Sequence, residues 1–426
     1  MERRDFLRLA STAGLSVAFG SLPLGRGARA DEPYAGPLWI MVHASGGWDP
    51  TSLCDPKPEL NTYVEADVVT LPNGIAYPNI TTLPGDPANA VPYNQLFFEK
   101  WGAELTVVNG IDCATNSHDV GTRNTWSGSL LENRPAFAAL CAGAYGATKP
   151  MAFITNGGYD VTANVVAQTR VGNIDALKRL AYPTLINPSS TEDRSTFHSE
   201  GTTARIVEAR RARHDAMLAK QQLPRFRAAM SQLYTARVGQ NELKRLTEYL
   251  PAPDELEQAQ LKRQAQVAIA AYQAGLCVSA NLTVGGFDTH GNHDVTQRNA
   301  LANLLDGVDF MMQLAIDKGL GDKVMISIGS DFGRTPQYNE GEGKDHWSIT
   351  SMMFMAKAIA RKGVVGATDE GHNPLEVSPA SLEVGSGVRI APGHIHKALR
   401  KLAGIDGGDI DRNFPIKEEE DLPIFG

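Results

Sequence analysis

Short continuous runs of apolar residues recur along the chain and are separated by longer polar or amphipathic stretches. The runs are rich in Val, Ile, Leu and Met, which is typical of strands that are buried on both faces of a parallel sheet. The expected strands cover residues 37–44, 105–111, 150–155, 278–284 and 324–328. The long stretches between them leave room for helical crossovers. The pattern therefore predicts an α/β fold with a central, mostly parallel sheet flanked by helices.

Charged or amphipathic segments between these runs predict the helices. The expected helical segments cover residues 203–249, 254–274, 296–318, 351–361 and 391–403. The segment at 351–361 would bury a Met-rich face. Residues 200–276 are expected to form a helical cap or insertion that packs on the sheet and has no catalytic role. The body of the chain, 31–426, is long enough for one large α/β domain or two ordinary ones, and the family resemblance given below implies a single one.

Residues 1–30 differ from the body and are interpreted as an export leader. They contain the twin-arginine pattern R-R-D-F-L at 3–7, a weakly apolar stretch at 9–24, and small residues at 28–30 where cleavage is expected. A membrane anchor is the alternative, which we disfavour because the stretch is short and glycine-rich for a span. We therefore expect export by the twin-arginine translocase to the periplasm or the cell exterior, and no stable membrane span.

The overall charge excludes some classes of partner. The formal net charge is −8, although the leader is basic, so the body of the chain is acidic. An acidic body offers no electrostatic attraction to nucleic acid or to an anionic membrane.

The four cysteines do not form a C-x-x-C pair, so the sequence gives no support for a structural zinc site. In an oxidising compartment one or two disulfides can form. Cys54 and Cys113 both follow predicted strands and are the pair we expect first. Cys277 lies in a predicted strand and is expected to be a small core residue.

Acidic and imidazole side chains follow three of the predicted strands at the point where each strand ends. They are Asp49 after the first strand, Asp288, His290 and His293 after 278–284, and Asp331, Asp345 and His346 after 324–328. Because the carboxyl ends of parallel strands meet at one edge of a sheet, we expect these groups to converge there. Mixed Asp and His ligands suit a divalent metal, or two metals that clamp a phosphoryl or sulfuryl group. The competing structural interpretation is that the histidines only join loops by hydrogen bonds.

The polar stretch after 105–111 contains two hydroxyl groups, Thr115 and Ser117, just before a predicted helix. A hydroxyl at a helix N-terminus can attack an anion, because free backbone N–H groups favour negative charge there. It can equally be an N-cap, which its residue type alone favours. Arg334 follows Asp331 closely and is expected to hold the oxygens of an anionic substrate.

Other catalytic patterns find less support. A Ser-His-Asp hydrolase of the nucleophile-elbow type requires G-x-S-x-G, which the chain lacks. The first strand is not followed by a P-loop or by G-x-G-x-x-G, so nucleotide binding of those types is unsupported.

Taken together, these motifs resemble the exported family called domain of unknown function 1501. The resemblance rests on the leader, G-G-x-D after the first strand, the Ser117-His118 pair, FDTH, SDFGRT, KDHW and the closing APGHIHKALRKLAGID. It covers nearly the whole mature chain. It implies membership of the alkaline phosphatase and sulfatase superfamily, whose members have a mostly parallel sheet between helices and one or two divalent metals. These enzymes cleave phosphate or sulfate esters with a Ser, Thr or modified Cys nucleophile.

Carried over position by position, the resemblance assigns roles to single residues. It implies metal ligation by Asp49, Asp288, His290 or His293, Asp331 and His346, and attack by Ser117 with Thr115 as the alternative. Where the superfamily often has Asp-His, this chain has Asp331-Phe332. Either one coordination sphere is incomplete, or Asp345-His346 supplies the pair and His394 or His396 the last ligand.

The sequence therefore leads to one main hypothesis and one alternative. The main hypothesis is an exported metal-dependent hydrolase that acts on small anionic esters or on sulfated or phosphorylated glycans. Its metal would be zinc, manganese, magnesium or calcium, and it would lower the pKa of the Ser117 hydroxyl. The alternative is a binding or assembly protein of the same fold with a degenerate site, which Phe332 favours.

Overall fold

The computed structural model describes residues 34–83, 89–147, 149–171, 178–179, 181–190, 192–223, 226–227, 230, 240–252 and 254–426. The expected leader at 1–30 lies outside these residues. Within them, no helix combines the length and the apolarity that crossing a bilayer requires.

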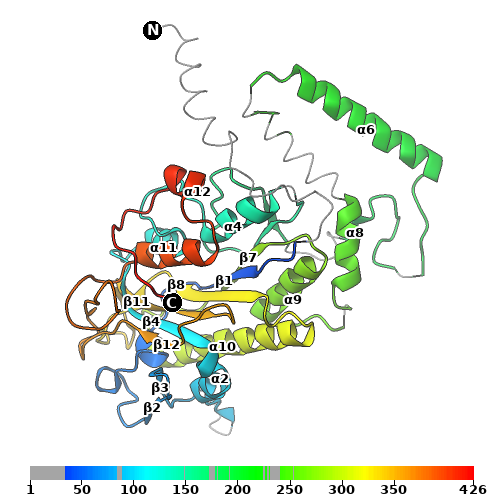
Figure 1. Cartoon of the computed structure of the whole chain (residues 1–426). Helices are drawn as coiled ribbons and strands as arrows, with labels where there is room; N and C mark the ends of the chain where they lie inside the picture. Colours follow the sequence, from blue (N-terminus) through cyan, green and yellow to red (C-terminus); the bar gives the residue numbers. More distant parts are fainter. Residues whose placement is uncertain are drawn as a thin grey trace, which may run out of the picture.

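One eight-stranded sheet forms the centre of the fold (Figure 1). Its strand order is β12-β4-β11-β8-β1-β7-β5-β6, and only β11 runs antiparallel to its neighbours. The strands are β1 Leu38–Ala44, β4 Leu105–Asp112, β5 Phe153–Thr155, β6 Gln168–Arg170, β7 Ser279–Val284, β8 Val324–Ser330, β11 Ile349–Met355 and β12 Gly363–Val365. The predicted mostly parallel α/β sheet is confirmed.

Helices cover both faces of the sheet (Figure 1). The side chains of β1 alternate: Leu38, Ile40 and Val42 pack into one apolar core, and Trp39 and Met41 into the other. The first core is covered by α2 Tyr93–Trp101, α9 Gln260–Gln273 and α10 His293–Asp317, and the second by α3 His118–Ser127, α4 Phe137–Gly146 and α11 Pro392–Leu402. Burial on both faces explains why the central strands are continuously apolar.

The remaining elements are short or peripheral. They are β2 Val68–Thr70, β3 Ala76–Pro78, β9 Gly333–Arg334, β10 His346–Trp347, α6 Glu200–Lys220, α8 Gln240–Tyr249, α12 Gly408–Asn413 and the 3-10 turns Pro50–Ser52, Pro58–Leu60 and Gly102–Glu104. Within the helical region 200–276, α9 packs against β7. Helix α6 has no buried residue and projects from the body (Figure 1).

The predicted helix at 351–361 is wrong. The segment begins as strand β11, which pairs with β4 on one side and β8 on the other, and continues as a loop. Met352 and Phe354 enter one core and Met353 and Met355 the other, which is the period of a strand. A short apolar run that is buried all round does not distinguish a strand from a helix by periodicity, which explains the error.

The Cys54–Cys113 disulfide, which the sequence left open, is not formed, because all four cysteines are free and buried. Cys54 belongs to one apolar core and Cys113 to the other. The sheet separates the two thiols, so they cannot approach each other. Burial raises the pKa of the Cys113 thiol to about 12.

The strand ends bring distant loops to one edge of the sheet. Ala44 of β1 pairs with Val284 of β7 on one side and with Ser330 of β8 on the other. These three residues are the last of their strands, so the loops that follow leave the sheet side by side. The end of β4 at Asp112 lies at the same edge, because it pairs with the first residue of β11. This edge carries the candidate site.

Candidate metal centre

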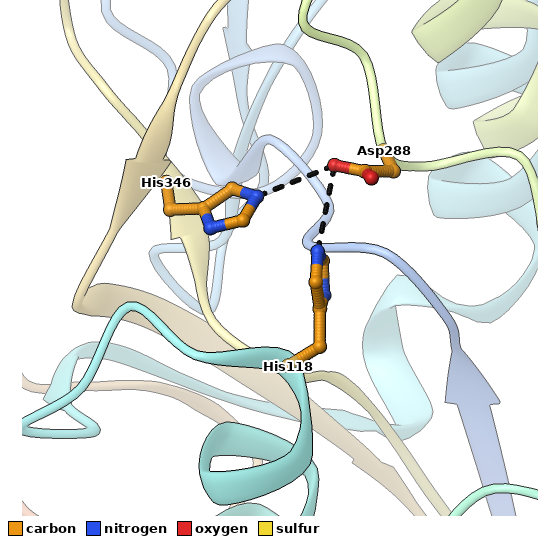
Figure 2. A group of neighbouring side chains, drawn as sticks. All are labelled: His118, Asp288 and His346. Atoms are coloured by element: carbon orange, nitrogen blue, oxygen red, sulfur yellow. Dashed lines mark hydrogen bonds and ion pairs between the residues drawn. The ribbon is translucent and has the colours of Figure 1, made fainter.

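Three histidines converge on one carboxylate at this edge (Figure 2 shows two of them). Asp288 and His290 follow β7, His346 lies on β10, and His118 is the first residue of α3, after β4. Oδ1 of Asp288 lies 3.1 Å from Nε2 of His290, 3.3 Å from Nε2 of His346 and 3.6 Å from Nε2 of His118. In a tetrahedral zinc site with bonds near 2.0 Å, ligand atoms lie about 3.3 Å apart. The observed spacing matches such a shell.

The other ring nitrogen of each histidine faces an acceptor at hydrogen-bond distance. The pairs are His118 Nδ1 with Asp331 Oδ2 at 2.6 Å, His290 Nδ1 with Asp345 Oδ1 at 2.8 Å, and His346 Nδ1 with the Asn116 carbonyl oxygen at 2.8 Å. A carboxylate or carbonyl oxygen can only accept, so each Nδ1 carries a proton. In a neutral ring the Nε2 atom then presents a lone pair, and metal-binding histidines are oriented in this way.

Two of these lone pairs point at each other and suit a positive charge between them, which a proton or a metal ion can supply. Nε2 of His290 and Nε2 of His346 are 2.9 Å apart, so two neutral rings in these tautomers would repel each other. A cation that binds both atoms and Asp288 removes the repulsion. Among the described residues, His118, Asp288 and His346 form the group whose ligand atoms all lie within 4.8 Å of one another, and His290 adjoins it through Asp288 and His346. The donor set therefore fits a divalent metal that accepts nitrogen and oxygen ligands.

The carboxylates of this cluster remain ionised. Burial by itself would raise the pKa of Asp288, but the hydrogen bond and the charge of Arg334 outweigh burial and lower it. Hydrogen bonds from His290 and Asn339 lower the pKa of Asp345. Each carboxylate therefore stays a charged acceptor at neutral pH.

Asp331 does not take the ligand position that was expected for it. Its Oδ2 contacts His118 and accepts the backbone N–H of Gly46 at 3.2 Å, and its Oδ1 lies 2.9 Å from Nε2 of His43. Burial would raise the pKa of Asp331, but the hydrogen bonds from His43 and His118 outweigh this and lower it. Asp331 thus orients the candidate ligand His118, and the His118 ring occupies the ligand position that was expected for the Asp331 carboxylate.

Asp49 also has partners other than those expected. Its Oδ1 accepts hydrogen bonds from the backbone N–H and the hydroxyl of Thr51, and its Oδ2 lies 2.9 Å from Lys344 Nζ and 3.0 Å from His293 Nε2. All of these side chains are buried. Burial would raise the pKa of Asp49, but Lys344 and His293 together hold it well below its usual range. The ammonium group of Lys344 stands where a metal was expected.

The Asp49 network and the Asp288 cluster are neighbours that do not share a ligand. Lys344 donates its backbone N–H to the Thr289 carbonyl, and His293 Nδ1 lies 2.7 Å from the Thr289 hydroxyl. Thr289 is the residue after Asp288. Asp49, Asp288 and Asp331 are therefore gathered at one edge, as expected, but they divide between two separate networks.

Arg334 is not placed to hold a substrate. Its side chain is fully buried. Nε donates to the Gly47 carbonyl at 2.8 Å, Nη1 to the Lys344 carbonyl at 2.9 Å, and Nη2 to the Gly46 carbonyl and to Asp288, the latter at 2.7 Å. The guanidinium therefore fixes the Asp288 carboxylate between two loops, because its donors are directed inward.

The two candidate nucleophiles lie beside His118. Ser117 is exposed and takes the N-cap position of α3, but its side chain makes no capping hydrogen bond. The Thr115 hydroxyl accepts the backbone N–H of Ser117 at 3.2 Å. The N-cap interpretation of Ser117 therefore holds for its backbone alone, and its hydroxyl is left for another partner.

The remaining candidates lie elsewhere. Nδ1 of His394 accepts the Ala391 N–H at the start of α11, and His396 donates from Nε2 to the Thr125 carbonyl at 2.8 Å. Neither faces Asp288. Phe332 is fully buried, and its ring packs against His118 and His346 with centroids 4.9 and 4.5 Å apart. It forms an apolar wall for two of the candidate ligands.

Sequence reasoning missed three residues that matter here: His43, His118 and Lys344. His118 was part of a noted motif, and its position at a helix start after a central strand was the available signal. His43 lies inside an apolar strand, where a single polar residue is a weak signal. Lys344 belongs to a glycine-rich loop, in which a lysine is normally solvent-exposed.

The fold and the site together define the class: this is an α/β protein with a mostly parallel sheet. Three histidines and a carboxylate form a candidate metal centre at the carboxyl edge of that sheet. Residues 38–384 match the family described as "Protein of unknown function (DUF1501)", and the chain belongs to that family. No curated protein sequence matches it.

Three of the matching solved structures are the following. The alkaline phosphatase from the Antarctic bacterium TAB5 is 7% identical with a TM-score of 0.37, over 87% of this chain and 100% of the phosphatase. The PsFucS1 sulfatase from Pseudoalteromonas sp. is 9% identical with a TM-score of 0.32, over 95% of this chain and 72% of the sulfatase. Ps i-CgsB in complex with k-i-k-neocarrahexaose is 8% identical with a TM-score of 0.37, over 92% and 75% of the two chains.

Proposed function

We propose that this protein is a metal-dependent hydrolase of phosphate or sulfate esters, in which Asp288, His118, His290 and His346 hold one divalent cation. The observation that carries the proposal is the arrangement of the three rings. Each presents Nε2 toward the centre, while its Nδ1 is held by an oxygen acceptor. Loop-joining histidines need no such common orientation, whereas a metal site does.

The bound cation would supply charge stabilisation for the oxygens of a phosphoryl or sulfuryl group. Ser117 is the candidate nucleophile, because its free hydroxyl is exposed one residue before His118. Its Oγ would form a bond to phosphorus or sulfur as the ester bond to the alcohol breaks, and the serine proton would pass to the leaving alcohol. Water would then cleave the seryl ester and release phosphate or sulfate. Arg334 acts on the reaction indirectly, by holding Asp288 ionised and in place.

The substrate class follows from this chemistry. We propose small anionic esters, or sulfated or phosphorylated glycans, as substrates. The twin-arginine pattern at residues 3–7 supports action outside the cytoplasm, after export.

The experiment compares four proteins: the wild type, Asp288→Ala, Ser117→Ala and Asp322→Ala. Asp322 is an exposed carboxylate paired with Lys357, so it controls for the loss of any aspartate. Metal content is measured by elemental analysis after dialysis, and turnover is measured with aryl phosphates and aryl sulfates. We expect about one metal per chain and turnover in the wild type and in Asp322→Ala.

The two site variants should fail in different ways. Asp288→Ala should lose the metal, and with it turnover by more than about a hundredfold. Ser117→Ala should keep the metal and lose turnover to a similar degree, with a stability loss below the roughly 1 kcal/mol of a true N-cap, because its hydroxyl caps nothing. Wild-type protein without metal, or metal that Asp288→Ala retains, would refute the metal centre.

A second function, metal-dependent binding without turnover, is favoured by the position of Arg334. The guanidinium that was expected to hold the anion is buried, and its donors are occupied. The same experiment separates the two functions. Wild-type protein that keeps its metal and cleaves no ester of a broad panel is a binding protein.

A further inference from the structure

Behind His118 lies a chain of buried polar side chains that the proposed reaction does not use. It links Trp126, His43, Asp331 and His118, which come from α3, β1, the loop after β8, and α3 again. Trp126, His43 and Asp331 are at most 3% exposed. Buried polar groups need hydrogen-bond partners, so the donor and the acceptor of each link in this chain can be assigned.

The first link fixes the proton on His43. Nε1 of Trp126 lies 2.7 Å from Nδ1 of His43. An indole N–H can only donate, so Nδ1 of His43 must accept and carries no proton. His43 therefore bears its proton on Nε2.

The second link joins the protonated nitrogen of His43, Nε2, to one carboxylate oxygen of Asp331. Nε2 of His43 lies 2.9 Å from Oδ1 of Asp331 and donates its proton to it. Because His43 is a neutral donor, it occupies one carboxylate oxygen without cancelling the negative charge. The other oxygen, Oδ2, receives the Gly46 N–H and faces His118.

The third link sets His118. Its Nδ1 lies 2.6 Å from Oδ2 of Asp331, so the proton of the ring sits on Nδ1 and Nε2 is directed at Asp288. A charged carboxylate on the far side of a ligating histidine orients the ring and raises the basicity of the ligating nitrogen. Trp126 thus acts on the centre through three side chains.

The backbone makes this arrangement rigid. Helix α3 carries both the first and the last member of the chain, and its Gly121 lies directly on the end of β8. A Cβ on Gly121 would come 2.4 Å from the Asp331 carbonyl oxygen, so a larger residue would lift the helix off the sheet. The chain closes a ring from α3 through two central strands and back to α3.

We propose that Trp126, His43 and Asp331 are positioning residues that present Nε2 of His118 to the metal. This inference rests on the proposed function, because it requires that His118 binds a metal. Asp331 belongs to the SDFGRT motif, whereas Trp126 and His43 lie outside the motifs named above, and the three residues share one task. Their removal should weaken metal binding and change the geometry of the site.

The test is Trp126→Phe, which keeps an aromatic ring and removes the donor. Trp101→Phe is the matched control, because Trp101 also donates its indole N–H, at 2.7 Å to Asp309, away from the site. The zinc dissociation constant is measured by competition with a chromophoric chelator, and the absorption spectrum is recorded with cobalt(II) in place of zinc. We expect about tenfold weaker binding and shifted cobalt bands for Trp126→Phe, and no change for Trp101→Phe.

Two further proteins keep the test decisive. His43→Phe breaks the same chain one link closer, so it should show the same loss if Trp126→Phe does not fold. Unchanged zinc affinity and an unchanged cobalt spectrum in the folded variant overturn the inference, while the wild type still binds metal. Asp288→Ala gives the zinc binding that remains without the centre, and wild-type protein that binds zinc no more tightly than this variant overturns the inference and the proposed function together.

Discussion

The Asp288 cluster and the Asp49 network start from the same local pattern, an aspartate just after a central strand, yet they differ in what balances the charge. The Asp288 side chain is 51% exposed and faces three imidazoles. The Asp49 side chain is 0% exposed and faces the ammonium group of Lys344, also 0% exposed. Asp288 pairs with Arg334 at 2.7 Å and still faces three imidazole nitrogens that suit a bound cation, whereas the ammonium group of Lys344 is the cation of the Asp49 network.

The comparison teaches that a carboxylate at a strand end is not in itself a metal ligand. Lys344 also donates to Asn61 at 2.6 Å, so its charge and its hydrogen bonds are satisfied inside the protein. A buried ion pair of this kind ties loops together, since removing one partner leaves an unpaired buried charge. Asp288 also has an internal cation, Arg334, but the three imidazole nitrogens that face it are ligands suited to a further, bound cation.

The largest effect should follow from Lys344→Met, which keeps the length of the side chain and removes its charge. Asp49 would remain buried with His293 and Thr51 but without its cation, and we expect a loss of about 3–5 kcal/mol in the free energy of unfolding. Urea denaturation measures this loss. Lys357→Met is the control, because Lys357 also pairs at 2.9 Å, with Asp322, but on the surface, where such pairs contribute little. Equal losses in both variants would contradict the distinction.

A smaller effect is expected when Asp345 is changed to Asn. This change keeps an acceptor for Nδ1 of His290 but removes the charge, and we expect about tenfold weaker metal binding. Asp49→Asn should leave the metal affinity as it is and lower the stability of the fold. A chelator competition assay beside a denaturation curve separates the two. Weaker metal binding in Asp49→Asn alone would show that the two networks have been assigned the wrong way round.

The smallest effect is on the pH dependence of stability. The pKa of Asp49 is lower in the folded than in the unfolded protein, so its contribution is complete above the unfolded value of about 3.9. It is lost as the pH falls through the lower folded-state pKa. The stability difference between the wild type and Asp49→Asn should therefore be constant near neutral pH and shrink in strong acid. Urea denaturation at a series of pH values measures it, and a difference that grows on acidification would contradict the sign.

Much of the fold could be predicted because the residue composition of its central strands differs clearly from that of the segments beside them. The segments that became β1 and β8 are mainly apolar runs, β7 carries β-branched and apolar residues, and all three end in glycine-containing polar loops, a pattern that needs no information from elsewhere in the chain. Strand β11 was missed because a Met-rich run that is buried on both faces suits either element. Its neighbours β4 and β8 decided the matter, and they lie far away in the sequence.

The candidate site was predicted in part. Asp288, His290 and His346 were named as ligands, and the structure brings them together. His118 faces Asp288 in the position expected for Asp331, and Asp331 instead contacts the far nitrogen of the His118 ring. Asp49 pairs with Lys344 and does not face Asp288. These exchanges depend on which side chain of another loop reaches a given carboxylate first, and spacing along the chain does not encode that distance.

The sequence by itself determined which strands form the sheet, at which edge its polar loops meet, and which residue types gather there, because hydrophobic periodicity and strand polarity are local properties. The tertiary structure alone decided which carboxylate received an internal ammonium group and which was left facing three imidazoles. The physical reason is that electrostatic pairing acts over a few ångströms in space, between groups that hundreds of residues can separate.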